Sequence, residues 1–282
     1  MERIATIKDM RYRIEKLKRS GKTIGFVPTM GYLHEGHLSL LDEAKKYSDV
    51  IIMSIFVNPT QFGPNEDFNS YPRDINRDEA LAESRGTDII FYPDVKEMYP
   101  SKILTWVNVE KITDVLCGAR REGHFKGVTT VVTKLFNIIK PNIAVFGQKD
   151  AQQAAVISKM VEDLNMDIEI KLAPIVREAD GLAMSSRNVR LSPGDRKNAK
   201  VLSQSLLMIK DGIAREEELS ELLKKAKNNI LETKGAQLDY LEARSYPNLE
   251  AINTCKGRCL VAIAVVFGDV RLIDNILIEN VS

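Results

Sequence analysis

Residues 50–56 read Val-Ile-Ile-Met-Ser-Ile-Phe, a short run that is apolar at nearly every position. A strand with one face in water would alternate apolar and polar side chains, so this run predicts a strand that is buried on both faces. Such strands are typical of parallel sheets that carry helices on both sides. The run therefore predicts an α/β domain built around a parallel sheet.

Helical and strand patterns alternate on both sides of this run. The expected helices are 7–19, 36–47, 77–85, 128–139 and 151–164, and the expected strands are 23–28, 49–57, 88–92, 142–146 and 167–172. In open parallel sheets, ligands bind beyond the carboxyl ends of the strands, where the strand order reverses. The segments that follow the strands are therefore the first places to look for a site.

The pattern changes after about residue 176. Leu191-Ser192-Pro193 begins a helical stretch that we expect to continue to about Asp211, and a Lys- and Glu-rich helix with a solvated face follows at 216–233. Three strands are expected at 238–244, 259–267 and 270–279, the last two joined as a hairpin. We predict two domains, 1–176 and 177–282, of which the second is a smaller α+β domain.

The overall composition excludes several classes of protein. The 282 residues include 40 basic and 39 acidic side chains, a formal charge of +1, so no global field attracts nucleic acid or an anionic membrane. No apolar run approaches the roughly 20 residues of a membrane-spanning helix, and no signal-peptide pattern is visible at the start. We expect a cytoplasmic protein whose partners are small molecules.

The three cysteines form neither a paired framework nor a C-x-x-C motif. We expect free thiols in a reducing compartment, with Cys255 and Cys259 as small core residues. A metal site is the weaker alternative, because no further Cys or His lies nearby.

The most informative segment, residues 28–37, reads Pro-Thr-Met-Gly-Tyr-Leu-His-Glu-Gly-His and leads from a strand into a helix. Its glycines permit a tight turn, and the free N–H groups at the helix start predict a phosphate site. His34 and His37 lie three residues apart, so both can face one side of the first turn, and the helix terminus favours neutral rings that donate hydrogen bonds. The alternatives are a metal site, although the zinc-protease spacing H-E-x-x-H is absent, and core or capping histidines.

Two further segments have the composition of phosphate sites. Residues 146–153, Phe-Gly-Gln-Lys-Asp-Ala-Gln-Gln, follow a strand and contain Lys149, which suits phosphate neutralisation but could be an ordinary surface lysine. Residues 181–188, Gly-Leu-Ala-Met-Ser-Ser-Arg-Asn, could close on a triphosphate or simply cap a helix. The fingerprint G-x-G-x-x-G and the P-loop motif are absent, which argues against a hydride-transfer enzyme and a P-loop kinase.

Two loops contain side chains suited to a polar substrate. Residues 58–63, Asn-Pro-Thr-Gln-Phe-Gly, supply amides that donate and accept at once, useful for a substrate with hydroxyls and a carboxylate. Residues 118–127 contain Arg120, Arg121, His124 and Lys126, and form either a basic flap or a solvated loop.

Together, these motifs resemble the pantothenate synthetase family. The resemblance rests on segments 28–37, 56–62, 71–73, 123–128, 146–150 and 184–187, in that order. His34-Glu35-Gly36-His37 is similar to the HIGH-type signature of a wider nucleotidyltransferase superfamily, and 184–187 stands where that superfamily carries its mobile KMSKS-type loop. The resemblance implies a Rossmann-like parallel sheet domain with a smaller α+β C-terminal domain.

The resemblance also implies an activity, the ATP-dependent condensation of pantoate with β-alanine through pantoyl adenylate. It implies ATP as a substrate, Mg²⁺ as a cofactor and a homodimer as the assembly. A nucleotidyltransferase that keeps the nucleotide on its product is an alternative within the superfamily. A nucleotide-sensing module without turnover is an alternative from another class.

The resemblance assigns roles to individual residues. Those expected to bind ATP are Met30, Gly31, Tyr32, Leu33, His34, Glu35, Gly36, His37, Gly147, Gln148, Lys149, Asp150, Val176, Met184, Ser185, Ser186 and Arg187. Those expected to act in catalysis are His34, His37, Lys149, Ser185, Ser186 and Arg187, with His37 the candidate general acid. Pantoate is expected at Asn58, Gln61 and Gln153, with Arg121 and the magnesium candidate Asp78 as weaker assignments.

Overall fold

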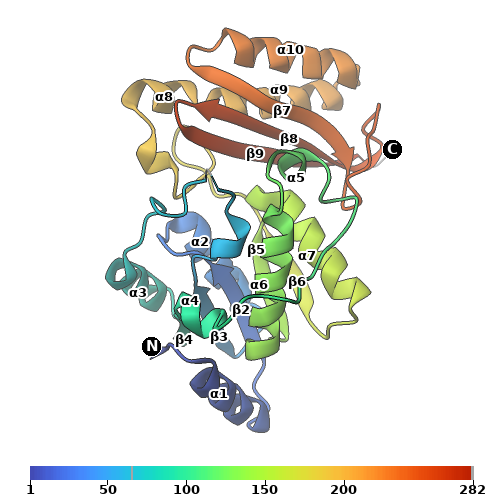
Figure 1. The fold of residues 1–282 in the computed structure, drawn as a ribbon. Helices are drawn as coiled ribbons and strands as arrows, with labels where there is room; N and C mark the ends of the chain where they lie inside the picture. The colour runs from blue at the N-terminus through green and yellow to red at the C-terminus, as the bar shows by residue number, and fades with distance from the viewer. Residues whose placement is uncertain (65, 281–282) are drawn as a thin grey trace. The chain divides into compact units, whose positions relative to one another are not determined.

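A computed structural model describes residues 1–64 and 66–280 (Figure 1). The chain divides into two compact units. The first unit contains Met1–Gly147 and Val156–Pro174, and the second contains Gln148–Ala155 and the described residues from Ile175 onward. Within the described ranges, no helix is both long and apolar enough to cross a bilayer.

The first unit is built on a six-stranded sheet in which all neighbours are parallel, as predicted. Its strands are β1 Glu2–Ile4, β2 Ile24–Thr29, β3 Val50–Ile55, β4 Ile89–Phe91, β5 Ile143–Gly147 and β6 Glu169–Ala173. Strand β1 was not predicted, because three residues are too few to show a periodic pattern.

The strand order, β1-β4-β3-β2-β5-β6, reverses direction at β2. From β2 the chain builds outward through β3 and β4 on one side, and then β5 returns to pair with the other side of β2, with Gly25 opposite Ile143. The carboxyl ends of β2 and β5 therefore lie next to each other at the point where ligands bind in folds of this class.

Helices cover both faces of this sheet. The helices of this unit are α1 Ile7–Arg19, α2 Glu35–Ala44, α3 Ile75–Ser84, α4 Val95–Met98, α5 Leu116–Arg120, α6 His124–Ile139 and the C-terminal part of α7 Ala151–Asp163. On one face, Val27 of β2 shares a core with Leu41 of α2. On the other face, Phe26 of β2 packs edge-on against Phe136 of α6, with ring centroids 6.2 Å apart. Successive residues of β2 are thus buried on opposite faces, which confirms the prediction of a covered parallel sheet.

The prediction of a loop over residues 118–127 is wrong in part. Residues 116–120 form α5, and α6 begins at His124, four residues before the predicted start. Gly123 precedes α6 with a φ of 74°, a conformation that glycine adopts without strain. The histidine therefore lies in the first turn of a helix, where its position is well defined.

The second unit contains a three-stranded antiparallel sheet in the order β7-β8-β9. Its elements after residue 175 are η3 Asn188–Arg190, α8 Pro193–Asn198, α9 Val201–Ala214, α10 Leu219–Glu232, β7 Ala236–Ser245, β8 Gly257–Phe267 and β9 Val270–Asn280. Leu206 of α9 and Leu222 of α10 share one core with Ile263 of β8. The predicted hairpin turns at Gly268, which has a φ of 59°.

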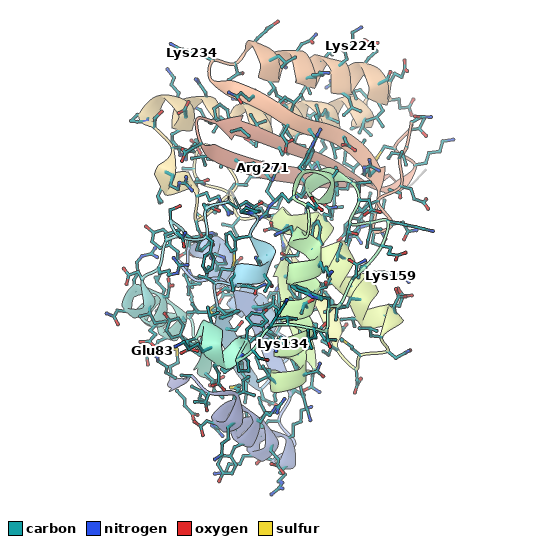
Figure 2. The ribbon with its side chains drawn as sticks, in the orientation of Figure 1. Glu83, Lys134, Lys159, Lys224, Lys234 and Arg271 are labelled. Atoms are coloured by element: carbon teal, nitrogen blue, oxygen red, sulfur yellow. A yellow bond between two sulfur atoms is a disulfide. The ribbon has the colours of Figure 1, made fainter. Side chains whose placement is uncertain are left out.

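Two details of this unit test the sequence patterns. The helix expected from about residue 191 to 211 is two helices, α8 and α9, and the side chain of Asn198 at the end of α8 donates to the carbonyl of Lys234, a contact that no local pattern encodes. The solvated face of α10 is confirmed. Lys224 projects from it, while Ala226 and Ile230 are buried (Figure 2).

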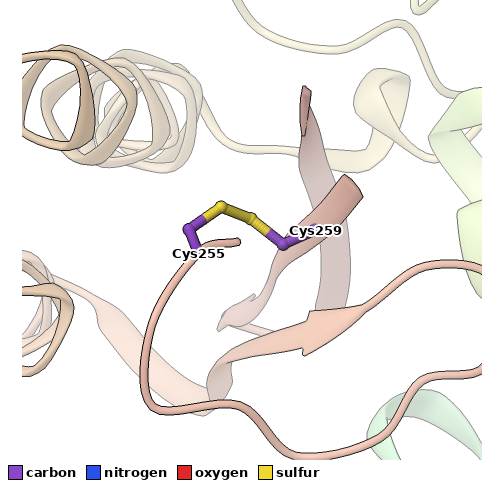
Figure 3. The surroundings of a disulfide bond; sticks show 2 residues. All are labelled: Cys255 and Cys259. Carbon is purple, nitrogen blue, oxygen red and sulfur yellow. A yellow bond between two sulfur atoms is a disulfide. The ribbon is translucent and has the colours of Figure 1, made fainter. Parts of the chain in front are cut away.

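Cys255 and Cys259 form a disulfide (Figure 3), so the prediction that the cysteines are unpaired is wrong for these two. Both are buried, as expected of small core residues. Gly257 lies between them with a φ of 70°, and their Cα atoms are 5.9 Å apart, within the range of ordinary disulfides. Their spacing alone did not reveal this turn. Cys117 is buried and does not take part in this disulfide.

Candidate active site

The turn at residues 30–37 leaves the carboxyl end of β2 and enters α2. Gly31 has a φ of 83°, and its N–H donates to Thr29 Oγ1 at 3.2 Å. Tyr32 also has a positive φ, 52°, which is uncommon for a residue with a Cβ. A backbone of this kind persists only when its surroundings hold it in place.

Asp78 of α3 holds this turn. Its carboxylate accepts hydrogen bonds from the N–H groups of Tyr32 and Leu33, each at 2.7 Å, and its side chain is 1% exposed. Burial raises the pKa of Asp78, and the two N–H groups only partly oppose this effect. A carboxylate whose two oxygens are buried against backbone amides does not suit Mg²⁺, which keeps several waters when bound. The structure therefore gives Asp78 a positioning role in place of the metal role expected from the resemblance.

Most backbone N–H groups of the turn already have acceptors. The N–H groups of Gly31, Tyr32 and Leu33 donate to the side chains of Thr29 and Asp78. The N–H of Gly36 donates to His34 Nδ1 at 3.1 Å, and the N–H of His37 donates to His34 O at 2.7 Å. The expectation that free amides at this helix start bind phosphate is wrong for these groups. Side chains of the turn are therefore better candidates for phosphate contact than these five amides.

The same bond determines the tautomer of His34. Because its Nδ1 accepts from Gly36, the ring hydrogen is on Nε2, which makes Nε2 a donor. The rings of His34 and His37 lie 4.1 Å apart, which confirms that the two histidines face the same side. Over residues 1–64 and 66–280 no group of three His, Cys, Asp or Glu side chains is arranged to hold a metal ion.

Two amide side chains, Asn58 and Gln61, follow the end of β3. Gln61 lies in the 3₁₀ helix η1, Pro59–Gln61, and Asn58 is the residue before this helix. Asn58 and Gln61 are buried, and Asn58 Nδ2 donates to Gln61 Oε1 at 3.0 Å. Asn58 Oδ1 accepts from the hydroxyls of Thr60 and Tyr99 at 3.0 and 2.8 Å. Burial raises the pKa of Tyr99, so the phenol keeps its hydrogen as a donor. Asn58 is thereby oriented with its oxygen toward donors and its nitrogen toward Gln61.

The amide pair lies directly beside the histidine turn. Gln61 Nε2 is 3.1 Å from the sulfur of Met30. On its other side, η1 packs tightly on α6, since a Cβ on Gly127 would lie 2.3 Å from the carbonyl oxygen of Thr60. The first unit thus brings Met30, Asn58 and Gln61 together.

Arg121 supports Gln61 through His124. Arg121 is bound by the carboxylate of Glu66 at 2.8 and 2.5 Å, and its Nη1 lies 3.0 Å from His124 Nε2. A guanidinium can only donate, so His124 Nε2 accepts and its Nδ1–H donates to Gln61 O at 2.9 Å. Burial acts to raise the pKa of Glu66, but the hydrogen bonds and charge of Arg121 outweigh it and lower that pKa. The structure assigns Arg121 to this chain of contacts, whereas the resemblance assigned it to substrate.

In the second unit, the 3₁₀ helix η2, Gln148–Asp150, carries Lys149. The Lys149 ammonium lies 3.9 Å from Asp150, a loose ion pair at a partly exposed site. The backbone of η2 is held by Asn275 of β9, which donates to the carbonyls of Gln148 and Lys149 at 2.9 Å each. Gln153 follows on α7 and is half-buried.

The loop that contains residues 184–187 also belongs to the second unit. Its base is a short antiparallel bridge between Arg177 and Ala183, and the N–H of Met184 donates to the carbonyl of Val176 at 3.0 Å. The residues expected at adenine and at the triphosphate, Val176 and Met184, are therefore neighbours. Within the loop, the N–H of Arg187 donates to Ser185 Oγ at 3.2 Å, and Ser186 is buried.

Charged side chains support this loop from outside. Arg196 of α8 binds Glu178 at 2.5 Å and Asp180 at 2.6 Å, and Asn188 donates to Glu178 at 2.6 Å. The hydrogen bond with Arg196 lowers the pKa of Asp180. All of these side chains are partly exposed, so this side of the loop is held by contacts that solvent and salt weaken.

Sequence reasoning missed several residues that orient the site. They are Glu66, Tyr99, Arg177, Asp274 and Asn275, and Asp78 was assigned to another role. A signal was present for one pair, because Asp274-Asn275 interrupts an apolar strand. The other contacts join residues far apart in the chain and have no local signature.

Comparison with known proteins assigns the chain to a family. The sequence profile described as Pantoate-beta-alanine ligase matches residues 2–277. The chain belongs to the pantoate-beta-alanine ligase family. A pantothenate synthetase from Acetivibrio thermocellus is 57% identical over 280 residues, covering 99% of this chain and 100% of that relative.

Solved structures of the same family share this fold. The pantothenate synthetase from Thermus thermophilus is 41% identical with a TM-score of 0.94, and the alignment covers 98% of this chain and 99% of that one. A pantoate-beta-alanine ligase from Francisella tularensis, described as complexed with β-γ ATP and β-alanine, is 36% identical with a TM-score of 0.80 over 98% and 97% of the two chains. The parallel sheet with its smaller antiparallel sheet is thus the pantoate-beta-alanine ligase fold, a HIGH-type nucleotidyltransferase fold.

Proposed function

We propose that this chain joins (R)-pantoate to β-alanine in two steps and consumes ATP. First, a carboxylate oxygen of pantoate attacks the α-phosphorus of ATP, and the bond to the bridging oxygen breaks to release pyrophosphate and leave pantoyl adenylate. Second, the amine of β-alanine attacks the acyl carbon, AMP leaves, and the nitrogen loses a proton. Activation is needed because a free carboxylate is a poor acyl donor, whereas AMP is a good leaving group.

The observation that carries this proposal is the contact between Gln61 and Met30 at 3.1 Å. It places an oriented amide pair, suited to a hydroxy acid, beside the turn whose histidines can donate to a phosphoryl group. A carboxylate held by the amides would lie close to a nucleotide held by the turn. Holding two reactants in one orientation replaces an improbable encounter in solution.

We assign the nucleotide roles residue by residue. His34, through Nε2–H, contacts a phosphate, and His37 is the general acid. Lys149 neutralises phosphate charge, the segment 147–150 holds the ribose and phosphates, and Val176 lies at adenine. In the loop at 184–187, Ser185, Ser186 and Arg187 stabilise the charge that builds on the leaving pyrophosphate.

The pantoate site is proposed at Gln61 and Gln153, with Gln61 also close to β-alanine. Asn58 belongs to this site by orienting Gln61, because its two amide hydrogens are already engaged by Gln61 and by the carbonyl of Gly127. Arg121 contributes indirectly, because its guanidinium is already engaged by Glu66 and His124. This assignment predicts that changes at Arg121 act through the position of Gln61.

Magnesium is proposed to enter with the phosphates of ATP. Sites of this kind commonly use one or two carboxylates together with substrate phosphates and water. Asp78 does not fit as a direct ligand, and we assign no protein ligand and no step to the metal.

From the resemblance we further propose a homodimer and a cytoplasmic location. Light scattering tests the dimer, and the mass of a single chain would contradict it.

The activity is tested by measuring pyrophosphate and AMP release from the purified protein with ATP, Mg²⁺ and (R)-pantoate, with and without β-alanine. We expect sustained AMP formation only when both pantoate and β-alanine are present. Omission of pantoate is the control for ATP hydrolysis. A product that retains the nucleotide would favour a nucleotidyltransferase, and no pyrophosphate release in any combination would overturn the proposal.

A further inference from the structure

Strand β9 contains a buried polar pair, Asp274-Asn275, inside the apolar sequence Leu272-Ile273 and Ile276-Leu277. The two residues are 2% and 3% exposed. Burial of a carboxylate or an amide is unfavourable unless specific partners satisfy it. The partners of this pair therefore indicate what the pair does.

Asn275 uses both hydrogens of its amide on η2. Nδ2 donates to the carbonyl oxygens of Gln148 and Lys149, each at 2.9 Å, and Oδ1 lies 3.4 Å from Gln148 Nε2. One planar group thus holds two successive peptide units of the turn that carries Lys149. A carboxylate in the same place has no hydrogen to donate, so asparagine is required by chemistry as well as by size.

Asp274 makes the equivalent connection to the loop at 184–187. Its two oxygens bind Arg177 at 2.6 and 3.0 Å, and Arg177 Nη1 also donates to the carbonyl of Gly181 at 3.1 Å. Arg177 is the residue that bridges to Ala183 at the base of the loop. The backbone N–H of Asn275 donates to Asp274 Oδ1 at 2.7 Å, so the same oxygen accepts from both Arg177 and Asn275.

We propose that Asp274 and Asn275 are positioning residues for the adenylation step, in which Asn275 sets the place of Lys149 and Asp274 sets the loop at 184–187. All of these residues belong to the second unit, and neither member of the pair contacts substrate in this scheme. The inference rests on the proposed function, because it assigns the adenylation roles of Lys149 and the loop. It predicts a selective effect on the step that handles the triphosphate.

Three variants test the pair. Asn275→Asp places acceptors against two carbonyls, and we expect kcat/KM for ATP in adenylation to fall by about 100-fold, the size seen when reacting groups are displaced by an ångström. Asn275→Ala removes the donors without adding charge and is expected to cost about 10-fold. Asp274→Asn weakens the charged contact with Arg177 and is expected to raise KM for ATP by roughly 10-fold.

The control is Glu242→Gln. Glu242 of β7 binds Arg244 of the same strand at 2.6 Å, and Arg244 also donates to the carbonyl of Leu249, so the variant removes an ion pair from the same sheet. We expect this variant to keep adenylation within about twofold of the unchanged protein, because substitutions of partly exposed residues away from a site usually have small effects.

The decisive readout separates the two half-reactions. Pyrophosphate release from ATP and pantoate reports adenylation, and pantothenate formation from supplied pantoyl adenylate and β-alanine reports the second step, which needs no triphosphate. We expect the first rate to fall in the three variants while the second stays within about threefold. Circular dichroism measures the folded fraction, and if Asn275→Asp does not fold, Asn275→Ala and Asp274→Asn decide.

Unchanged adenylation in the folded variants would overturn the inference, and so would a parallel loss of both half-reactions, because each indicates a purely structural pair. Both results presuppose that the unchanged protein forms pantoyl adenylate. Its failure to do so would instead defeat the proposed function, so the two failures are distinguishable.

Discussion

The turn at 30–37 and the loop at 184–187 are both assigned to phosphates, yet they are held in different ways. The turn is held from within the first unit by a buried carboxylate, Asp78, that binds two backbone amides. The loop has a buried anchor at its base, where Asp274 binds Arg177, and its outer side is held by partly exposed ion pairs of Arg196. Buried, satisfied contacts give a rigid backbone, whereas exposed pairs contribute little to stability. The comparison indicates a preorganised turn and a loop that is fixed at its base and adjustable on its outer side.

The largest expected effect is the loss of a phosphate donor from either unit. His37→Ala and Lys149→Ala should each lower the rate of pyrophosphate release by about 10²–10³, the usual cost of removing one preorganised donor. This rate is measured by quenching reactions with ATP and pantoate at set times and quantifying the pyrophosphate released. Lys159→Ala, an exposed lysine further along α7, is the control for Lys149. Near-normal pyrophosphate release in either variant would remove that residue from the mechanism.

The next effect compares two glycines with positive φ, Gly31 in the turn and Gly181 at the loop. A Cβ on Gly31 would lie 2.9 Å from Asp78 Oδ2 and from Ile55 Cγ2, whereas a Cβ on Gly181 would lie 3.3 Å from the flexible hydroxyl of Ser203. We expect Gly31→Ala to lower the free energy of unfolding by about 3 kcal/mol and Gly181→Ala by about 1 kcal/mol. Urea unfolding measures both, and equal losses would argue against a more tightly held turn.

Asp78→Asn tests the buried anchor directly. An asparagine can accept from only one of the two N–H groups through its oxygen, and its own NH₂ faces the other. The expected loss is about 2 kcal/mol, from one unsatisfied buried donor. The melting temperature should fall by roughly 4–8 °C. Asp42→Asn removes an exposed pair with Arg85 and serves as the control, and an effect no larger than the control's would show that the turn does not depend on Asp78.

Arg196→Ala tests the exposed support of the loop. We expect a loss of at most about 1 kcal/mol in stability, because the pairs are partly exposed. KM for ATP should nevertheless rise, and the difference from the unchanged protein should shrink as salt is added, since salt already weakens these pairs. Steady-state kinetics over a range of NaCl concentrations measure this, and a salt-independent difference would mean that the ion pairs of Arg196 do not support the loop.

The smallest effect is a difference in pH dependence. Burial raises the pKa of Asp78, so the folded protein binds this proton more tightly, and the contribution to stability is lost as pH rises above 3.8 through the raised pKa. Arg196 lowers the pKa of Asp180, so the stability that the Asp180 carboxylate contributes is present above pH 3.8 and is lost as pH falls through the lowered pKa. Unfolding free energies of Asp78→Asn and Asp180→Asn, measured between about pH 3 and 6, should differ from the unchanged protein with opposite slopes. Slopes of the same sign would contradict this difference between the two anchors.

The architecture follows from patterns that are local in the sequence. The apolar run at 50–56 requires burial on both faces, and the spacing of Met10, Ile14 and Leu17 defines helix α1 as observed. The order of motifs was sufficient to identify the family. Each of these signals depends on residues that are neighbours along the chain, which is why it is readable without a structure.

The state of the site depends on contacts between residues that are distant in the chain. Asp78 reaches Tyr32 across 46 positions, and Asn275 reaches Lys149 across 126 positions. Only such contacts show that the amides of the turn are engaged and that Arg121 supports Gln61. Periodicity reports which face of an element is buried, but it carries no information about which distant polar group will satisfy a particular donor, because that choice is made only when the chain packs.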